Sequence, residues 1–458
     1  MGNFLRLHKF PLLLVITGLL LYGSFGYDLE REDFVKLITL YTGLFFVSWK
    51  LIQLEKVNFW FLATVALLFR LVFIGALPVL SQDFYRFIWD GKMLLAGWNP
   101  YLYLPQELFE KGTAPISQAA ELYNGMGKLS AGNYTNYPPF NQLIFALAAL
   151  FAGKGLLGPV ILMRLVIIAA DVGVLYFGKK LLEKLGLPRH RIFWYILNPL
   201  VIIELTGNLH FEGVMVFFLV GSLYLLHHKK WVLSAILFAA SVLLKIIPLL
   251  FLPLLIGYFR KEKTGIRSTD FKKLFGFYLV VGFTVILGFL PFLSPAFFSS
   301  FGSSIALWFQ KFEFNASFYY LVRWVGFQGK GYNIIETAGK VLPLIVLAIL
   351  LGLTFFRKNN STDRLITGML LGISVYFFLA TTVHPWYLIT PLLLSIFTRY
   401  SFVLIWSFLV ILSYYTYSNP EFQENLWLVA LEYVVVLLWF AREVAVNTKK
   451  REVIVAAD

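Results

Sequence analysis

The chain has 458 residues, of which 59% are hydrophobic and 14% are charged, and its mean hydropathy is +0.75. Soluble domains carry about 25% charged residues, so this composition excludes a soluble protein and indicates a polytopic membrane protein. A net charge of +14 could indicate nucleic-acid binding in a soluble protein. Here the basic residues cluster in short loops between apolar runs, as the positive-inside rule describes, and no nucleic-acid partner is expected. The chain has no cysteine, which excludes disulfides and thiolate metal sites.

Apolar runs of about 20 residues, or fewer where neighbouring helices shelter them, predict an all-α bundle with about 14 transmembrane helices. The first run follows basic residues as in a signal peptide, but it lacks a clear small-x-small cleavage site, so we expect a retained span. The predicted spans are residues 10–26, 34–53, 57–79, 157–178, 192–207, 213–227, 232–244, 246–259, 274–292, 339–356, 365–382, 387–398, 401–416 and 426–441.

The charges of the loops predict the orientation of the chain. Basic loops such as 179–191 should face the cytoplasm, which places both termini there. Two long loops, 80–137 and 293–338, then lie on the outer side of a single membrane domain covering 1–458. Residues 138–153 are apolar enough to cross, but counting them would move the basic loop outside. We therefore expect them to form a re-entrant or incomplete span.

Residues 81–103 are the first to break the apolar pattern with mixed charges and aromatic side chains. At helical spacing, Asp83, Arg86 and Asp90 share one face, and apolar residues share another. This pattern predicts an interfacial helix with its apolar side in lipid and its carboxylates facing a cavity. Gly97 is the expected cap at its C-terminal end. The alternative is that the two carboxylates are solvated charges on such a helix.

Most other polar clusters within the apolar sequence fall on the same predicted side. Ionisable residues at span ends are costly in lipid, so they are functional candidates by default. Each has a structural alternative: Lys245 could snorkel, His210 and Glu212 could form a structural pair, and His384 could belong to an interfacial aromatic belt. Their convergence on one side favours a binding site. The candidate binding residues are Arg86, Asp90, Asn99, Tyr137, His210, Glu212, Lys245, Asn315, Arg323, His384, Trp386 and Tyr387.

A carboxylate, an outward cavity and scattered cations suit a reaction in which a base removes a proton while an anionic group leaves, as in glycosyl transfer from a lipid phosphate. Several motifs between about residues 60 and 400 can be compared with known sequences: Asp83-Phe84-Tyr85-Arg86-Phe87 with Trp89-Asp90-Gly91, Gly97-Trp98-Asn99-Pro100-Tyr101, Tyr137-Pro138-Pro139, Asn208 to Gly213, Lys245 to Pro248 with Pro253, and His384 to Tyr387. In these motifs the chain resembles the polytopic GT-C glycosyltransferases, and among them the bacterial polyprenyl-phosphate-mannose-dependent mannosyltransferases.

This resemblance implies a GT-C-like helical bundle with a catalytic aspartate in the first large extracytoplasmic loop, which here is Asp83. It implies transfer of a hexose, expected to be mannose, from a polyprenyl-phosphate donor to a hydroxyl of an acceptor glycan or glycolipid. The reaction would take place at the outer face of a bacterial inner membrane, among membrane lipids. No cofactor and no protein-bound metal are expected, although a divalent cation stays open. Two spans precede the one that leads into the Asp83 loop, where the family usually has one.

The residues favour a single inverting displacement with Asp83 as the general base. No cysteine can act as a nucleophile, Asp90 lies two helical turns away, and Glu212 would have to come from another loop. Two alternatives stay open. A transporter or flippase of a lipid-linked saccharide could use the same cavity and cations, and a saccharide polymerase or ligase could use a lipid diphosphate donor. A transferase needs the single carboxylate, whereas a flippase needs a path open to both sides.

Overall fold

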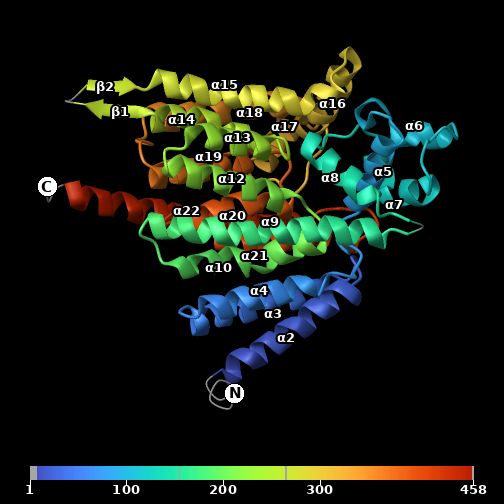
Figure 1. The fold of residues 1–458 in the computed structure, drawn as a ribbon, viewed down its shortest axis with the longest axis horizontal. Coiled ribbons are helices and arrows are strands. Elements are labelled where there is room, and N and C mark those ends of the chain that lie inside the picture. The colour runs from blue at the N-terminus through green and yellow to red at the C-terminus, as the bar shows by residue number, and fades with distance from the viewer. Residues whose placement is uncertain (1–7, 154, 264–265, 456–458) are drawn as a thin grey trace.

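The computed structural model of the protein describes residues 8–153, 155–263 and 266–455. Long helices run side by side along the long axis of the molecule (Figure 1). The strands in these ranges form one antiparallel hairpin of β1 (Arg260–Lys263) and β2 (Ile266–Thr269). The predicted all-α polytopic architecture is confirmed, with this hairpin as a small addition in a loop predicted to be cytoplasmic.

The two ends of the bundle carry different elements. Figure 1 shows the β1–β2 hairpin and the C-terminal end of α22 (Leu426–Val455) at one end. The opposite end carries α5 (Asp83–Leu95), α6 (Pro105–Glu110) and α7 (Ala119–Ala131). The long loop predicted to lie outside and the basic hairpin predicted to lie inside are therefore separated by the length of the bundle.

The N-terminal helices are α2 (Lys9–Tyr27), α3 (Phe34–Glu55) and α4 (Phe59–Leu71). A buried ion pair, with Arg70 Nε 2.7 Å from Asp171 Oδ2, joins α4 to α9 (Leu157–Lys184). Both side chains are almost fully buried, so each charge depends on the other inside the apolar bundle. The pair holds α4, which precedes the segment leading to α5, against α9.

Among the described residues, six helices are long and apolar enough to cross a membrane, or seven if one bent pair is counted as a single span. This is fewer than the predicted number because several apolar runs form shorter helices, including α4. The predicted spans 192–207 and 213–227 correspond to the bent pair Pro199–Gly207 and Glu212–His227, whose axes differ by 117°. The break between them places polar residues inside the bundle, as described below.

The helix predicted around Asp83 is present as α5. Its C-terminal end is a Schellman motif, in which Gly97 adopts a φ of +79° and Trp98 N donates to Met93 O at 2.9 Å. The predicted lipid contact is not observed, because Phe84, Phe87 and other apolar residues of α5 are buried against α7 and α8 (Pro139–Ala149). The helix is thus an internal element of the fold.

The packing of α5 on α8 depends on a glycine. A Cβ atom at Gly91 would lie 2.1 Å from the Phe145 carbonyl oxygen, so no larger residue fits without moving one helix. One turn earlier, Phe87 stacks on Phe145 with ring centroids 4.4 Å apart. The α8 helix has 11 residues, about 16 Å at 1.5 Å per residue, which is shorter than the hydrocarbon core of a membrane. Residues 138–153 thus contain a helix too short to cross a membrane by itself, and the re-entrant or incomplete span stays a prediction.

The apolar surface of α15 (Phe271–Phe289) indicates where lipid would contact the bundle. Only 17% of its most apolar window is buried, and Phe275 and Phe283 are each 64% exposed.

The remaining elements are η1 (Pro100–Leu102), η2 (Arg189–Ile192), α10 (Phe193–Ile196), α11 (Pro199–Val201), η3 (Ile202–Gly207), α12 (Glu212–His227), α13 (Trp231–Val242), η4 (Ile247–Phe251), α14 (Leu252–Tyr258), η5 (Leu290–Phe292), α16 (Pro295–Gln310), α17 (Phe318–Lys330), α18 (Ile335–Phe355), α19 (Thr362–Leu379), η6 (Pro385–Leu388), α20 (Ile389–Ser395), α21 (Phe402–Leu409) and η7 (Val410–Ser418).

Candidate active site

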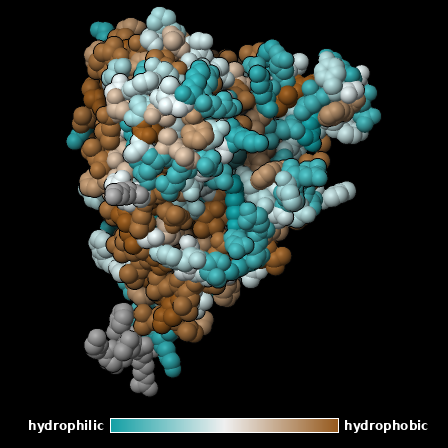
Figure 2. Space-filling view, turned by 90° about the vertical axis from the view of Figure 1, so that its right-hand side faces the viewer, coloured by the Kyte–Doolittle hydropathy of each residue, from teal (hydrophilic) through white to brown (hydrophobic). Residues whose placement is uncertain are grey.

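A cavity of about 1330 Å³ brings together residues from distant parts of the chain, and we call it the central cavity. Its lining includes residues of α5 and α7, which lie at the end of the molecule that Figure 2 shows face-on, where hydrophilic residues gather. Most of the predicted site residues line it, namely Asp83, Arg86, Tyr137, His210, Glu212, Lys245, Arg323, His384, Trp386 and Tyr387. Asp90, Asn99 and Asn315 are absent from the lining.

Asp83 is the first residue of α5, and 36% of its side chain is exposed in the central cavity. Its backbone N–H donates to Ser81 Oγ at 3.2 Å, which fixes the start of the helix. The His210 ring lies beside it, with Nε2 3.8 Å from Asp83 Oδ2. Burial, followed by the negative charge of Asp83, raises the pKa of the neighbouring Tyr137 well above its ordinary value. Asp83 is therefore a reachable carboxylate held between two aromatic groups.

Glu204 stands behind His210 and was not predicted from the sequence. It lies in the π-helical η3 and is fully buried, with Oε2 3.2 Å from His210 Nδ1. Tyr414 donates its hydroxyl to Glu204 Oε1 at 2.8 Å, and Asn208 Nδ2 donates to Oε2 at 3.2 Å. Glu204, His210 and Asp83 thus form a line from the interior to the cavity. The signal in the sequence was a carboxylate within an apolar run.

Lys245 contributes a cation to the central cavity from the turn between α13 and η4. It forms an ion pair with Glu212, the first residue of α12, and its Nζ lies 4.5 Å from the centroid of the Tyr387 ring. About one third of the Lys245 side chain remains exposed. Burial lowers the pKa of Lys245 to about 7, and the negative charge of Asp83 opposes this shift. The lysine can therefore change its charge near neutral pH.

Aromatic rings form a stack along one wall of the cavity. Trp386 lies between His210 and His384, with centroid distances of 3.8 and 4.4 Å. Phe314 extends the stack, with its ring 4.9 Å from His384. Burial, and then the positive charge of Lys245, lower the pKa of His384 well below its ordinary value. A neutral His384 next to Trp386 gives this wall a flat, weakly polar surface.

Arg323 lies in α17 and forms an ion pair with Glu313. Asn315 is close by in sequence, but it is fully buried and supports the backbone of this segment. Its N–H donates to Glu424 Oε1 at 2.6 Å, and its carbonyl accepts a hydrogen bond from the Tyr433 hydroxyl at 2.7 Å. Of these two predicted binding residues, Arg323 therefore lines the cavity and Asn315 lies behind its wall.

Arg86 and Asp90 form a buried ion pair within α5, with Nε 2.7 Å from Oδ1. Gln142 of α8 donates to the other Asp90 oxygen at 3.0 Å, so this carboxylate is used within the fold. Asn99 has a similar role, because its side chain caps η1 and donates to the Phe292 carbonyl at 3.3 Å. In the part of the chain that the structure describes, no group of three His, Cys, Asp or Glu side chains is arranged to hold a metal ion.

Comparisons with known proteins bear on this site. Residues 24–260, just over half of the chain, match the model of a protein family described as alpha-(1->6)-mannopyranosyltransferase, N-terminal domain. A protein of Mycobacterium tuberculosis (strain ATCC 25618 / H37Rv), alpha-(1->6)-mannopyranosyltransferase A, is 20% identical over 336 residues. That alignment covers 69% of this chain and 61% of the relative, so less than two thirds of the relative's length is spanned. The family match includes Asp83 and Lys245 and ends before Arg323 and His384.

Proposed function

This chain belongs to the alpha-(1->6)-mannopyranosyltransferase family, and we propose that it transfers mannose from a polyprenyl phosphate to a hydroxyl of an acceptor glycan or glycolipid. The reaction takes place at the outer face of a bacterial inner membrane. The observation that carries this proposal is the Asp83 carboxylate, which is reachable from a large cavity that also contains cationic and aromatic side chains. The mycobacterial relative is a mannopyranosyltransferase, which supports mannose as the sugar.

Asp83 is the general base of the proposed reaction. A sugar hydroxyl is a weak nucleophile, and a positioned carboxylate that removes its proton contributes typically 10²- to 10⁴-fold in rate. As Asp83 takes this proton, the acceptor oxygen bonds to the anomeric carbon of the mannose. The bond from that carbon to the phosphate oxygen breaks, and its electron pair leaves with the polyprenyl phosphate. One displacement on one face inverts the anomeric configuration.

Cations of the cavity stabilise the leaving phosphate. Lys245 and Arg323 line the cavity, and each is held in place by a carboxylate, Glu212 and Glu313 respectively. A positive charge near the developing phosphate charge lowers the barrier without a proton donor. Because these cations come from separate elements, they favour one position of the phosphate relative to Asp83.

The wall formed by the ring stack suits the sugar. His210, Trp386 and His384 present conjugated rings beside the Asp83 carboxylate. Such rings offer a broad contact area with few polar groups, while hydrogen bonds at their edges fix orientation. The mannose or the acceptor saccharide would lie against this wall, with the reacting hydroxyl directed toward Asp83.

The test is transfer by purified protein in lipid nanodiscs, with radiolabelled polyprenyl-phosphate mannose and mannose-containing acceptors. Wild type should yield a labelled product with inverted anomeric configuration, and Asp83→Asn should reduce the rate at least ~10²-fold. Asp363→Asn makes the same chemical change at an exposed residue of α19 outside the cavity lining and serves as the matched control. Near-wild-type transfer by Asp83→Asn, or retention of configuration, would refute this mechanism.

A further inference from the structure

The cationic side chains of the central cavity differ in how their charge is compensated. Three are paired with carboxylates: Arg86 with Asp90, Lys245 with Glu212 and Arg323 with Glu313. Lys128 forms no ion pair among the described residues, but it is exposed to solvent. Arg31, from the loop between α2 and α3, also lines the cavity and is half-buried. Within the described ranges it forms no ion pair, although the exposed Glu32 lies next to it in sequence and also lines the cavity.

The Arg31 guanidinium has unused hydrogen-bonding capacity and no carboxylate partner among the described residues. Its Nε is buried and has no hydrogen-bond partner among the described residues. Removing a charge from water without a nearby opposite charge is costly. Five N–H groups on a planar fork suit phosphate oxygens, which an arginine can bind through two parallel hydrogen bonds. A phosphate ligand would thus supply the negative charge that the Arg31 guanidinium lacks.

The loop that carries Arg31 is firmly attached on both sides. The Lys36 ammonium group donates to the Asp28 carbonyl at 2.6 Å and to its carboxylate at 2.7 Å. Asp33 caps α3 by accepting a hydrogen bond from the Lys36 N–H at 3.0 Å. Phe34 packs edge-on against Tyr415 of η7, with centroids 5.3 Å apart. These contacts give Arg31 a fixed position above the C-terminal part of the chain.

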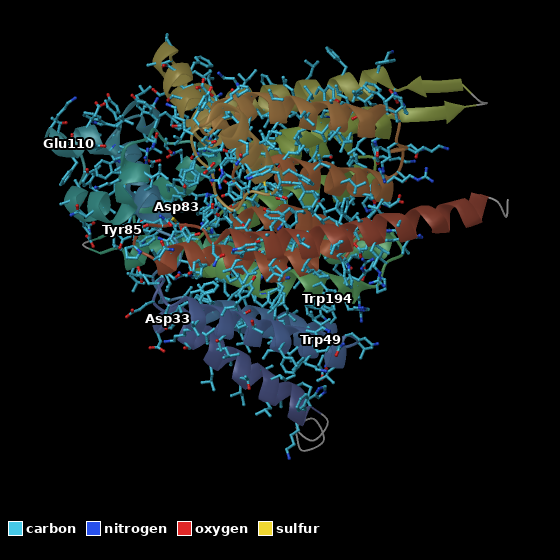
Figure 3. The ribbon with its side chains drawn as sticks, turned by 180° about the vertical axis from the view of Figure 1, so that it is seen from behind. Asp33, Trp49, Asp83, Tyr85, Glu110 and Trp194 are labelled. Atoms are coloured by element: carbon cyan, nitrogen blue, oxygen red, sulfur yellow. The ribbon has the colours of Figure 1, made fainter. Side chains whose placement is uncertain are left out.

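Arg31 is held next to the site described above. Its guanidinium carbon lies 3.5 Å from the centroid of the Tyr417 ring, which also lines the central cavity. Its positive charge contributes to the lowered pKa of His384 in the ring stack. In Figure 3, Asp33, which belongs to the same loop, lies at the same end of the molecule as Asp83. The N-terminal helices therefore deliver a cation to the cavity that contains the proposed base.

We propose that Arg31 binds the phosphate of the lipid donor. The α2–α3 pair then has a function in the site, because it positions this residue over the cavity. The identity of the lipid rests on the proposed function, whereas the need for an anion rests on the contacts of Arg31 itself. Tyr417 keeps the guanidinium in place by stacking. The terminal nitrogens, rather than the buried Nε, are the proposed donors to the phosphate oxygens.

Direct binding tests this role without requiring transfer. Polyprenyl phosphate is titrated into wild type, Arg31→Gln and Arg31→Lys in nanodiscs, and quenching of tryptophan fluorescence is recorded. Arg31→Gln should weaken binding about 10- to 100-fold because a charged hydrogen-bond donor is lost. Arg31→Lys should lie in between, since it keeps the charge and loses the fork. Arg399→Gln changes an exposed arginine outside the cavity lining and should bind as wild type does.

Two further ligands distinguish phosphate binding by Arg31 from a purely structural role of this residue. Neutral polyprenol of the same length should bind wild type and Arg31→Gln equally, and inorganic phosphate alone should bind far more weakly than the lipid. Unchanged affinity of Arg31→Gln for polyprenyl phosphate would overturn the proposal. An equal loss for polyprenol would do the same, because it would indicate a purely structural role. If Arg31-dependent binding is found and mannose transfer is not, the proposed function fails while the phosphate site stands.

Discussion

Asp83 and His210 face each other at the wall of the central cavity, with 3.8 Å between the carboxylate oxygen Oδ2 and the ring nitrogen Nε2. The other ring nitrogen of His210 lies 3.2 Å from the buried Glu204. Hydrogen bonds from Tyr414 and Asn208 hold Glu204 in turn. A proton taken up by Asp83 therefore has a neighbouring imidazole within a small movement, and a second carboxylate lies on the far side of that imidazole.

Glu204→Gln should slow transfer without weakening donor binding. The amide keeps the shape and removes the negative charge beside His210, which would stabilise a protonated imidazole, so we expect kcat to fall about 10-fold with an unchanged KM for the donor. Steady-state rates at varied polyprenyl-phosphate mannose would measure both constants. Glu55→Gln, at a buried carboxylate of α3 that lies 2.6 Å from a histidine ring nitrogen and outside the cavity lining, is the matched control. A higher donor KM with normal kcat in Glu204→Gln would contradict this role.

The pKa of Lys245, lowered by burial to about 7, predicts a pH-dependent donor affinity. Below pH 7 the lysine is mostly protonated and attracts the donor phosphate, whereas above pH 7 it becomes mostly neutral. The donor KM of wild type should therefore rise several-fold between pH 6 and pH 8.5. Lys245→Arg stays charged over this range and should flatten the profile. A profile for Lys245→Arg that matches wild type would assign the titration to another group.

Gly91→Ala should destabilise the protein and reduce its activity together. The added methyl group would approach the Phe145 carbonyl to 2.1 Å, which forces α5 and α8 apart at an overpacking cost of about 1–3 kcal/mol. Thermal unfolding in detergent would show a lower midpoint than wild type. Gly352→Ala in α18 is the matched control, since an added Cβ there would meet nothing within 4 Å. Equal midpoints for Gly91→Ala and wild type would show that the helices adjust freely.

Cysteine labelling would test the predicted orientation, because the natural chain contains no cysteine. Glu110, at the exposed end of α6 in Figure 3, lies in the loop predicted to be outside. Asn360, exposed in the loop between α18 and α19, belongs to a segment predicted to be cytoplasmic. An impermeant maleimide should label Glu110→Cys on intact cells and Asn360→Cys only after lysis. The reverse pattern would invert the proposed location of the site.

The sequence was sufficient to predict features that depend on local chemistry. The helix that carries Asp83, Arg86 and Asp90, and its glycine cap at Gly97, follow from charge pattern and backbone freedom. The shared cavity of His210, Lys245 and His384 followed from a simple constraint, since polar groups in an apolar chain must collect where lipid is excluded.

Other features depend on contacts that sequence spacing does not specify. Glu204 is easily overlooked in the apolar run 192–207, because one carboxylate changes the mean hydropathy of the run little. The 117° bend after Gly207 arises from packing in the bundle, and hydropathy alone reads it as two ordinary spans. In the sequence, Arg31 is one of several charged residues in a short loop. Only the fold brings it to Tyr417, nearly four hundred positions later.

The walls of the central cavity come from both sides of residue 260, where the family match ends. Asp83 and Lys245 precede that boundary, whereas Arg323, Trp386 and Tyr417 follow it. The α3 helix is itself bonded to the far part of the chain, because the Tyr41 hydroxyl donates to the Ser407 carbonyl at 2.6 Å. A fragment that ends at residue 260 would lack the cavity walls supplied by the later residues, so the proposed base would lie in an incomplete site. A chimaera that joins the first half of one relative to the second half of another would combine cavity walls that do not match. A working chimaera should therefore take the cavity-lining residues on both sides of residue 260 from the same relative.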